Sequence, residues 1–115
     1  MRPDLPGFSV IPAGKPLPDA TEWLASNRMQ HLVDEIKQRY PDRYVIFDSP
    51  PLTYTVDAAV LAAQVDVIVL VVRAGKTPRD EIAQAIQVLD PAKIAGVVFN
   101  GVQDERKRYG YGYGQ

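Results

Sequence analysis

Two short segments of this sequence are apolar without polar alternation, and they constrain the fold more than any other feature. The first is 44–47, and the second is 66–72, which is aliphatic and almost entirely β-branched from Val67 onward. Strands with one solvated face alternate polar and apolar residues, whereas strands of parallel sheets are covered on both faces and do not. We therefore predict two buried strands here. Two further strands are predicted at 8–11, which Pro12 ends, and at 94–99.

Helical patterns separate these strands. The first helix is expected from Asn27, as its N-cap, to the residue before Pro41, and a short alanine-rich helix follows at 56–64. The third has Thr77 as predicted N-cap and Pro78 at its first position. Alternating strands and helices build parallel sheets with right-handed crossovers. The fold class predicted is α/β, a partial doubly wound, mostly parallel sheet with helices on both faces.

Composition excludes several classes of function. With 13 Lys+Arg and 14 Asp+Glu the net charge is -1, which argues against a nucleic-acid partner. The absence of cysteine excludes disulfides, cysteine zinc sites and thiol catalysis, and a single histidine excludes a two-histidine metal site. The longest aliphatic run, 67–72, is too short to span a bilayer, and no signal-peptide pattern opens the chain. We expect a cytoplasmic chain without direct membrane insertion.

Ligands of open parallel sheets bind outside the carboxyl ends of the strands, which directs attention to two residues. Asp48 follows the strand predicted at 44–47 and precedes Ser49, Pro50 and Pro51. A carboxylate held there suits a hydrated Mg²⁺, although an aspartate in this context equally caps a turn. Asn100 follows the last strand. Its amide has the donor and acceptor that an adenine edge requires, but Asn-Gly is also a common turn pair.

The segment Gly75-Lys76-Thr77 resembles the end of a phosphate-binding P-loop and lies between a strand and a helix. A P-loop requires a glycine five residues before Gly75, where this chain has Leu70 inside the strand. We therefore reject a P-loop at this position. A weaker role for Arg73 or Lys76 beside an anion stays open.

The C-terminal segment 103–115 is basic at 106–108 and then alternates tyrosine with glycine. Such a segment cannot form a core, so we expect a flexible tail. Tyr109, Tyr111 and Tyr113 are candidate phosphate acceptors, and each phosphate would add about -1.5 to -2 charges. The alternative is a low-complexity aromatic tail that adheres to partners.

Taken together, these motifs resemble the C-terminal half of a bacterial tyrosine autokinase, of the capsule and exopolysaccharide type within the MinD/ParA-like deviant-Walker P-loop ATPases. The resemblance rests on 7–14, on the Walker B-like run 45–51 and on 57–58. It continues through 66–77, 96–100 and the tyrosine cluster. It implies tyrosine phosphorylation with ATP and Mg²⁺, Asp48 acting on the metal, Asn100 near adenine, and Tyr109, Tyr111 and Tyr113 as acceptors.

The resemblance also implies a domain organisation and partners. Residues 1–102 would form the C-terminal part of a P-loop kinase domain that lacks the P-loop strand, and 103–115 its tail. The absent strand would leave an unpaired edge or a gap in the sheet. Without Walker A the phosphates have no cradle, so we expect little activity from this chain alone. Implied partners are a membrane chain-length determinant that activates the kinase, at the inner face of the membrane, and neighbouring subunits of a homo-oligomer.

Two rival functions follow from the same residues. One is a non-catalytic adaptor or phosphoacceptor module that pairs with a separate P-loop half. The other is a receiver-like domain phosphorylated on Asp48. That domain needs an acidic pair after its first strand and a lysine after its last, but here Ile11 precedes Pro12 and Phe99 precedes Asn100. We therefore discount the receiver-like function.

Overall fold

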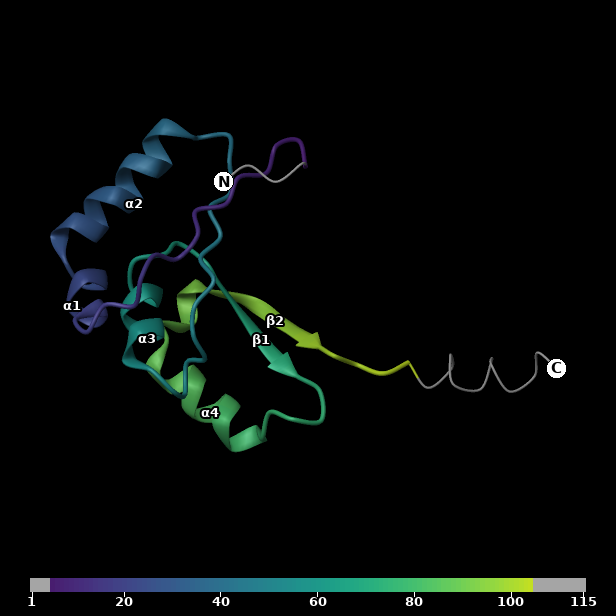
Figure 1. Cartoon of the computed structure of the whole chain (residues 1–115). Helices are drawn as coiled ribbons and strands as arrows, with labels where there is room; N and C mark the ends of the chain where they lie inside the picture. The colour runs from purple at the N-terminus through teal and green to yellow at the C-terminus, as the bar shows by residue number, and fades with distance from the viewer. Residues whose placement is uncertain (1–4, 105–115) are drawn as a thin grey trace.

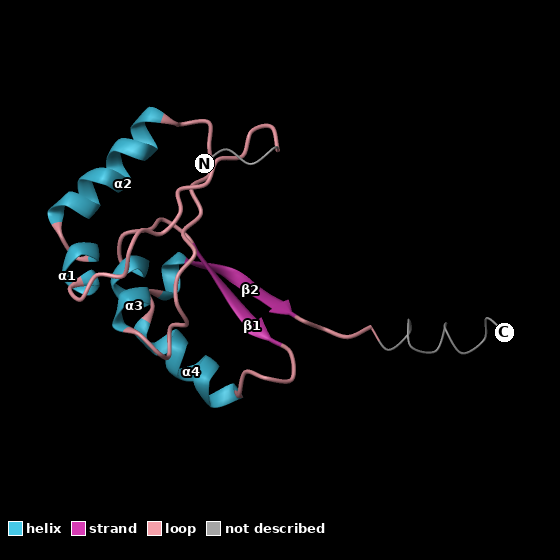
Figure 2. Cartoon of the chain, in the orientation of Figure 1, coloured by secondary structure: helices cyan, strands magenta, loops and turns pink. Residues whose placement is uncertain are grey.

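The computed structural model describes residues 5–104 of the chain. It combines helices with a small parallel sheet, as an α/β chain should (Figure 1; Figure 2). In chain order the elements are α1 (Ala20–Leu24), α2 (Asn27–Arg39), α3 (Val56–Ala62), β1 (Ile68–Arg73), α4 (Arg79–Val88), the 3₁₀ turn η1 (Pro91–Lys93) and β2 (Ile94–Asn100). The three predicted helices are present, and α1 is an additional helix that the sequence pattern did not predict.

The sheet consists of β1 and β2, which run parallel and are joined through α4 and η1. Their register runs from Ile68 opposite Ile94 to Arg73 opposite Asn100, with one irregularity between Ile68 and Val69. Parallel strands need a crossover connection, and the helical pattern between them supplies it. The predicted strand–helix–strand unit over residues 66–100 is therefore confirmed.

The strands predicted at 8–11 and 44–47 are absent from the described structure, which corrects the sequence analysis. Both segments are irregular, and the side chains of Tyr44 and Ile46 are 99% and 85% exposed. A strand needs a hydrogen-bonding neighbour as well as β-prone side chains. The apolar run at 44–47 shows that the side chains are β-prone, but it does not show whether a neighbouring strand is present.

The expectation of helices on both sheet faces is also wrong for the described residues. Successive side chains of a strand point to opposite faces. Val72 is buried at 5% exposure, whereas Val69 and Val71, which share the other face, are 55% and 57% exposed. Only one face of β1 is therefore covered within residues 5–104.

Helix ends differ from the predictions by a residue or two. The N-cap of α2 is Ser26, whose hydroxyl accepts a hydrogen bond from the Met29 amide at 3.3 Å, so the prediction of Asn27 is corrected. The helix ends at Arg39, before Pro41, as predicted. Pro78, rather than Thr77, occupies the N-cap position of α4.

The core within residues 5–104 is small and draws on α2, α3, β1 and α4. Its buried apolar side chains, each 5–8% exposed, are Val33, Ala58, Leu61, Val72, Ala85 and Leu89. Helix α1 packs against both α2 and α3. Two hydrogen bonds reinforce the α1–α3 contact: the Thr21 hydroxyl donates to the Asp57 carboxylate, and the Gln64 side chain donates to the Leu24 carbonyl.

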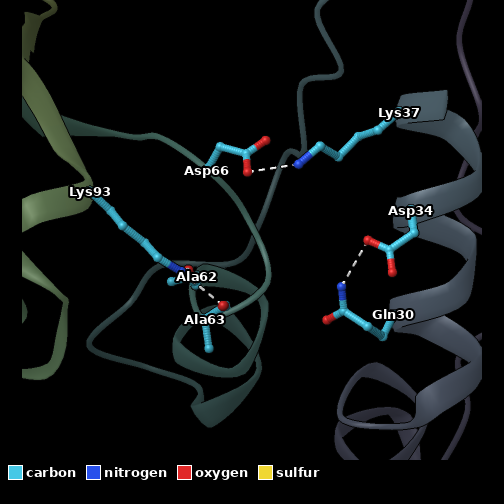
Figure 3. Close-up of polar contacts among 7 residues, drawn as sticks. All are labelled: Gln30, Asp34, Lys37, Ala62, Ala63, Asp66 and Lys93. Atoms are coloured by element: carbon cyan, nitrogen blue, oxygen red, sulfur yellow. Dashed lines mark hydrogen bonds and ion pairs between the residues drawn. The ribbon is translucent and has the colours of Figure 1, made fainter. Parts of the chain in front are cut away.

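Two lysines connect the helices to the rest of the chain (Figure 3). The Lys37 ammonium of α2 contacts the Asp66 carboxylate, just before β1, at 2.8 Å. The Lys93 ammonium of η1 donates to the carbonyl of Ala63, at the end of α3, at 2.8 Å. Within residues 5–104 no helix is both long enough and apolar enough to cross a bilayer.

Candidate functional site at the carboxyl ends of the strands

The turn that follows β1 lies beside the last residue of β2. The Ala74 amide donates to the Asn100 carbonyl at 2.8 Å, which extends the ladder one step beyond the strand. The Arg73 amide donates to the Thr77 hydroxyl at 3.0 Å, and Gly75 adopts a φ of +71°, a conformation that glycine adopts most readily. These bonds close a tight turn between β1 and α4.

The same turn explains why Gly75-Lys76-Thr77 is not a phosphate cradle. The amides of Lys76 and Thr77 both donate to the Arg73 carbonyl, at 3.1 and 3.0 Å. A P-loop instead directs its amides toward the phosphates. Because the turn already uses these donors, the geometry agrees with the rejection made from the glycine spacing.

Asn100 lies where the sequence analysis expected it, at the carboxyl end of a strand. It is the last residue of β2, its side chain is exposed, and it pairs in register with Arg73 of β1. One amide and one guanidinium side chain therefore occupy neighbouring strand ends. The predicted contact of Asn100 with adenine remains a prediction.

Asp48 lies in the irregular segment before α3, and its side chain is exposed. Within residues 5–104, Asp48 forms no ion pair, and it forms no hydrogen bond with Asn100. The structure therefore does not bring these two predicted site residues into contact. Next to Asp48, the Ser49 hydroxyl donates to the Pro50 carbonyl at 3.2 Å. The Asp48 carboxylate is therefore open to solvent and available to a ligand.

The described residues contain no group of three histidine, cysteine, aspartate or glutamate side chains that could hold a metal ion. Asp48 therefore cannot be one member of an all-protein cage within residues 5–104. A single exposed carboxylate fits the water-mediated contact predicted for Mg²⁺, a cation that retains several waters in such sites. The acceptor candidates Tyr109, Tyr111 and Tyr113 lie outside the described residues.

Sequence reasoning missed the role of Lys93. A cavity of about 300 Å³ lies between α3 and the end of α4, lined by Ala59, Ala62, Ala63, Val88, Leu89, Asp90 and Lys93. The Lys93 ammonium satisfies the carbonyls of Ala63 and Ala62 at 2.8 and 3.5 Å. These carbonyls lack partners within the helix, so the lysine stabilises the end of α3. No local pattern reveals this contact, because 30 residues separate Lys93 from Ala63.

The Lys37–Asp66 pair is the main electrostatic feature away from the strand ends. The hydrogen bond from Lys37 to Asp66, together with the charge of that carboxylate, raises the pKa of the Lys37 ammonium above its usual 10.5. Both side chains are at least half exposed. The pair therefore orients α2 relative to the start of β1 and takes no part in the candidate site.

Comparisons with known proteins identify relatives of the chain, although no family model matches it. It is 33% identical to the tyrosine-protein kinase CpsD of Streptococcus agalactiae in an alignment of 116 positions that covers 97% of this chain and 50% of that protein. It is 35% identical to the putative tyrosine-protein kinase EpsB of Ralstonia solanacearum over 113 residues, 96% of this chain and 15% of that protein. A third relative, the tyrosine-protein kinase YwqD of Bacillus subtilis, is 35% identical over 90% of this chain and 44% of its own length.

These relatives confirm the resemblance to bacterial tyrosine kinases that the motifs indicated. The similarity extends over nearly the whole chain rather than over one motif. The chain spans half or less of the length of these three relatives.

Proposed function

We propose that this chain, a relative of the bacterial tyrosine-protein kinases over nearly its whole length, is part of an ATP-dependent protein tyrosine autokinase. The observation that carries the proposal is the 33% identity to one such kinase over 97% of the chain. In this proposal the fold is the C-terminal part of a P-loop NTPase-like kinase domain. The chain contributes one carboxylate for the metal and the tyrosines that accept phosphate.

Asp48 is the residue proposed to organise Mg²⁺. Its exposure and its freedom from ion pairs within residues 5–104 support this role, because a carboxylate neutralised by a lysine or arginine binds a cation weakly. The carboxylate would accept hydrogen bonds from metal-bound waters, and bound Mg²⁺ would neutralise phosphate charge. Asn100, exposed at the end of β2, is proposed to contact the adenine of ATP.

The proposed acceptors are Tyr109, Tyr111 and Tyr113, which follow the basic run 106–108 within the tail. Each phosphate adds about -1.5 to -2 charges, so three of them turn a basic segment into a strongly acidic one. An acidic tail is repelled by the triphosphate of ATP. This repulsion is a physical reason for the tail to leave an active site once it is phosphorylated.

We propose further that residues 1–115 alone phosphorylate tyrosine very slowly. Phosphoryl transfer depends on positioning and charge neutralisation of the phosphates, for which a P-loop lysine and backbone amides are the usual device. The glycine-lysine-threonine turn of this chain uses its amides for internal hydrogen bonds. In the cell we propose that the chain acts in the control of capsule or exopolysaccharide synthesis. There it would associate with neighbouring kinase subunits and with a membrane chain-length determinant, at the inner face of the membrane.

The experiment uses the purified chain with Mg-ATP, alone and with the Streptococcus agalactiae relative, followed by mass spectrometry. We expect little or no phosphotyrosine in the chain alone, and phosphate on one or more of Tyr109, Tyr111 and Tyr113 when the relative is present. Tyr44 is the internal control, because it is 99% exposed and should stay unmodified if accessibility alone does not define an acceptor. Strong self-phosphorylation contradicts the proposed inactivity, and an unmodified tail contradicts the acceptor assignment.

The second candidate is a non-catalytic adaptor or phosphoacceptor module that pairs with a separate P-loop half. The uncovered apolar face of β1 favours it, because such a face suits a protein partner. Asp48→Asn separates the two candidates when the chain is mixed with only the half of the Streptococcus agalactiae kinase that it does not match. Loss of tail phosphorylation supports a catalytic contribution from this chain, whereas unchanged phosphorylation supports the adaptor.

A further inference from the structure

Two cations occupy the turn that follows β1, at the end of the sheet where β2 also ends. The Lys76 amide donates to the Arg73 carbonyl at 3.1 Å, so residues 73–76 form a β-turn. The Cα atoms at the two ends of such a turn lie less than about 7 Å apart. Both side chains are exposed. A guanidinium and an ammonium are therefore within reach of one phosphate group.

Neither cation has an anionic partner within residues 5–104. The ion pairs of that region join Lys37 to Asp66 and Arg39 to Glu35. A guanidinium has five donors in a planar fork that matches two oxygens of a phosphate. The backbone amides of the turn already donate to the Arg73 carbonyl, so a phosphate must be held by the side chains. We call Arg73 and Lys76 the cation pair.

The chain leaves the sheet beside this pair (Figure 1). Arg73 is in register with Asn100, the last residue of β2, and the Ala74 amide donates to the Asn100 carbonyl at 2.8 Å. Tyr109 follows Asn100 by nine residues. An extended segment of nine residues spans about 30 Å, so the tail tyrosines can reach the cation pair of their own chain. A short flexible linker gives a tethered group an effective concentration on the order of millimolar, so weak contacts suffice.

Phosphorylation reverses the charge of the segment that would bind. The side chains of 103–115 include three basic and two acidic residues, which gives a net charge of +1. The cation pair repels a segment of that charge. Phosphates on Tyr109, Tyr111 and Tyr113 would each add about -1.5 to -2 charges, which brings the segment to about -3.5 to -5. The same segment is then attracted to the cation pair.

We propose that Arg73 and Lys76 bind the phosphotyrosines of segment 109–113 of the same chain. The tail then docks on its own turn after phosphorylation, and the phosphates held there are shielded from other proteins. The inference rests on the proposed function for the origin of the phosphates. A phosphorylated tail of a second copy meets the same two cations but lacks the tether, so the dependence on chain concentration distinguishes the two occupants.

Binding is measured by fluorescence anisotropy with the full chain and a labelled synthetic peptide of residues 103–115 phosphorylated on its three tyrosines. We expect Arg73→Gln to weaken binding at least fivefold, and Lys76→Gln to act in the same direction. Arg28→Gln is the matched control, because it removes one charge from an exposed arginine on α2 and should change binding less than twofold. The unphosphorylated peptide should not bind measurably.

The urea midpoint of each variant should match that of the wild type, because all of them keep the backbone donors of the turn. Failure of the wild-type chain to bind the phosphorylated peptide overturns the proposal. So does equal binding of the two peptides, or an equal effect of Arg73→Gln and Arg28→Gln, because the attraction is then one of overall charge.

Docking within one chain is measured on the full chain with the three phosphotyrosines installed by semisynthesis. A non-specific phosphatase should remove phosphate at least threefold more slowly from this chain than from the free peptide. Arg73→Gln should restore the rate of the peptide, and the protection should not depend on chain concentration. Protection that grows with concentration overturns the proposal, because the occupant is then a second copy, and so does an unprotected wild-type chain.

These phosphates are introduced by synthesis, so both measurements are independent of kinase activity. A negative result here leaves the tail phosphorylation test unaffected, and the reverse also holds.

Discussion

The Asn100 carbonyl accepts a hydrogen bond from the Ala74 amide at 2.8 Å, which holds the end of β2 against the turn that follows β1. The two residues lie 26 positions apart in the sequence and meet because β1 and β2 run parallel in register. Polar groups at the carboxyl ends of both strands therefore lie at the same end of the sheet.

Gly75→Ala should destabilise the turn after β1. Gly75 has a φ of +71°, where a side chain costs about 1 kcal/mol. We expect the free energy of unfolding, measured with urea, to fall by that amount. Gly14→Ala is the control, because Gly14 has no positive φ and open space around it, and it should be neutral or slightly stabilising. Equal effects of the two substitutions would contradict the conformation of the turn.

Val72→Ala should show which face of β1 is buried. Val72 is 5% exposed, and loss of its two methyl groups should lower the free energy of unfolding by about 2 kcal/mol. The same substitution at Val69, which is 55% exposed, should cost less than half as much. Urea unfolding of the two variants checks this, and a larger loss for Val69→Ala would reverse the assignment of the faces.

Lys93→Met should destabilise the end of α3. The substitution keeps most of the aliphatic length but removes the ammonium that donates to Ala63 at 2.8 Å. We expect a loss of about 1 kcal/mol in the free energy of unfolding, the usual contribution of such a hydrogen bond. Lys15→Met, in the exposed segment before α1, should be neutral. A neutral Lys93→Met would mean that water replaces the lysine without cost.

The Lys37–Asp66 pair predicts a pH dependence at the alkaline end. Because the folded state raises the pKa of Lys37 above 10.5, its contribution to stability is complete below about pH 10.5. It is lost as the pH rises through the raised value. The urea midpoint of Asp66→Asn should therefore lie below that of the wild type at pH 8, and the gap should close above pH 10.5.

Glu35→Gln is the control for this titration. Glu35 contacts Arg39 at 3.8 Å, and an arginine does not lose its proton in this range. Any gap between Glu35→Gln and the wild type should therefore persist above pH 10.5. If the difference in urea midpoint between Asp66→Asn and the wild type also persisted above pH 10.5, the stabilisation would not depend on the charge of Lys37, which contradicts the prediction.

Local sequence signals placed most helices and the strands that have a partner. The prolines at 41 and 78, the acidic residues of the first turn of α4 and the aliphatic run before Arg73 act over a few residues, so they can be recognised without the fold. Helix boundaries shifted by one or two residues. At the start of α2 this is because Ser26 and Asn27 are comparable N-cap residues.

Contacts between distant segments could not be predicted in this way. Nothing near residues 44–47 indicates whether a neighbouring strand exists, since pairing depends on chain elsewhere. Likewise, no local pattern predicts that Lys93 contacts Ala63 or that Lys37 contacts Asp66. Each contact exists only after separate elements have packed. Propensity and charge act locally and can be read along the chain, whereas strand pairing, face burial and long-range ion pairs depend on which surfaces the folded chain brings together.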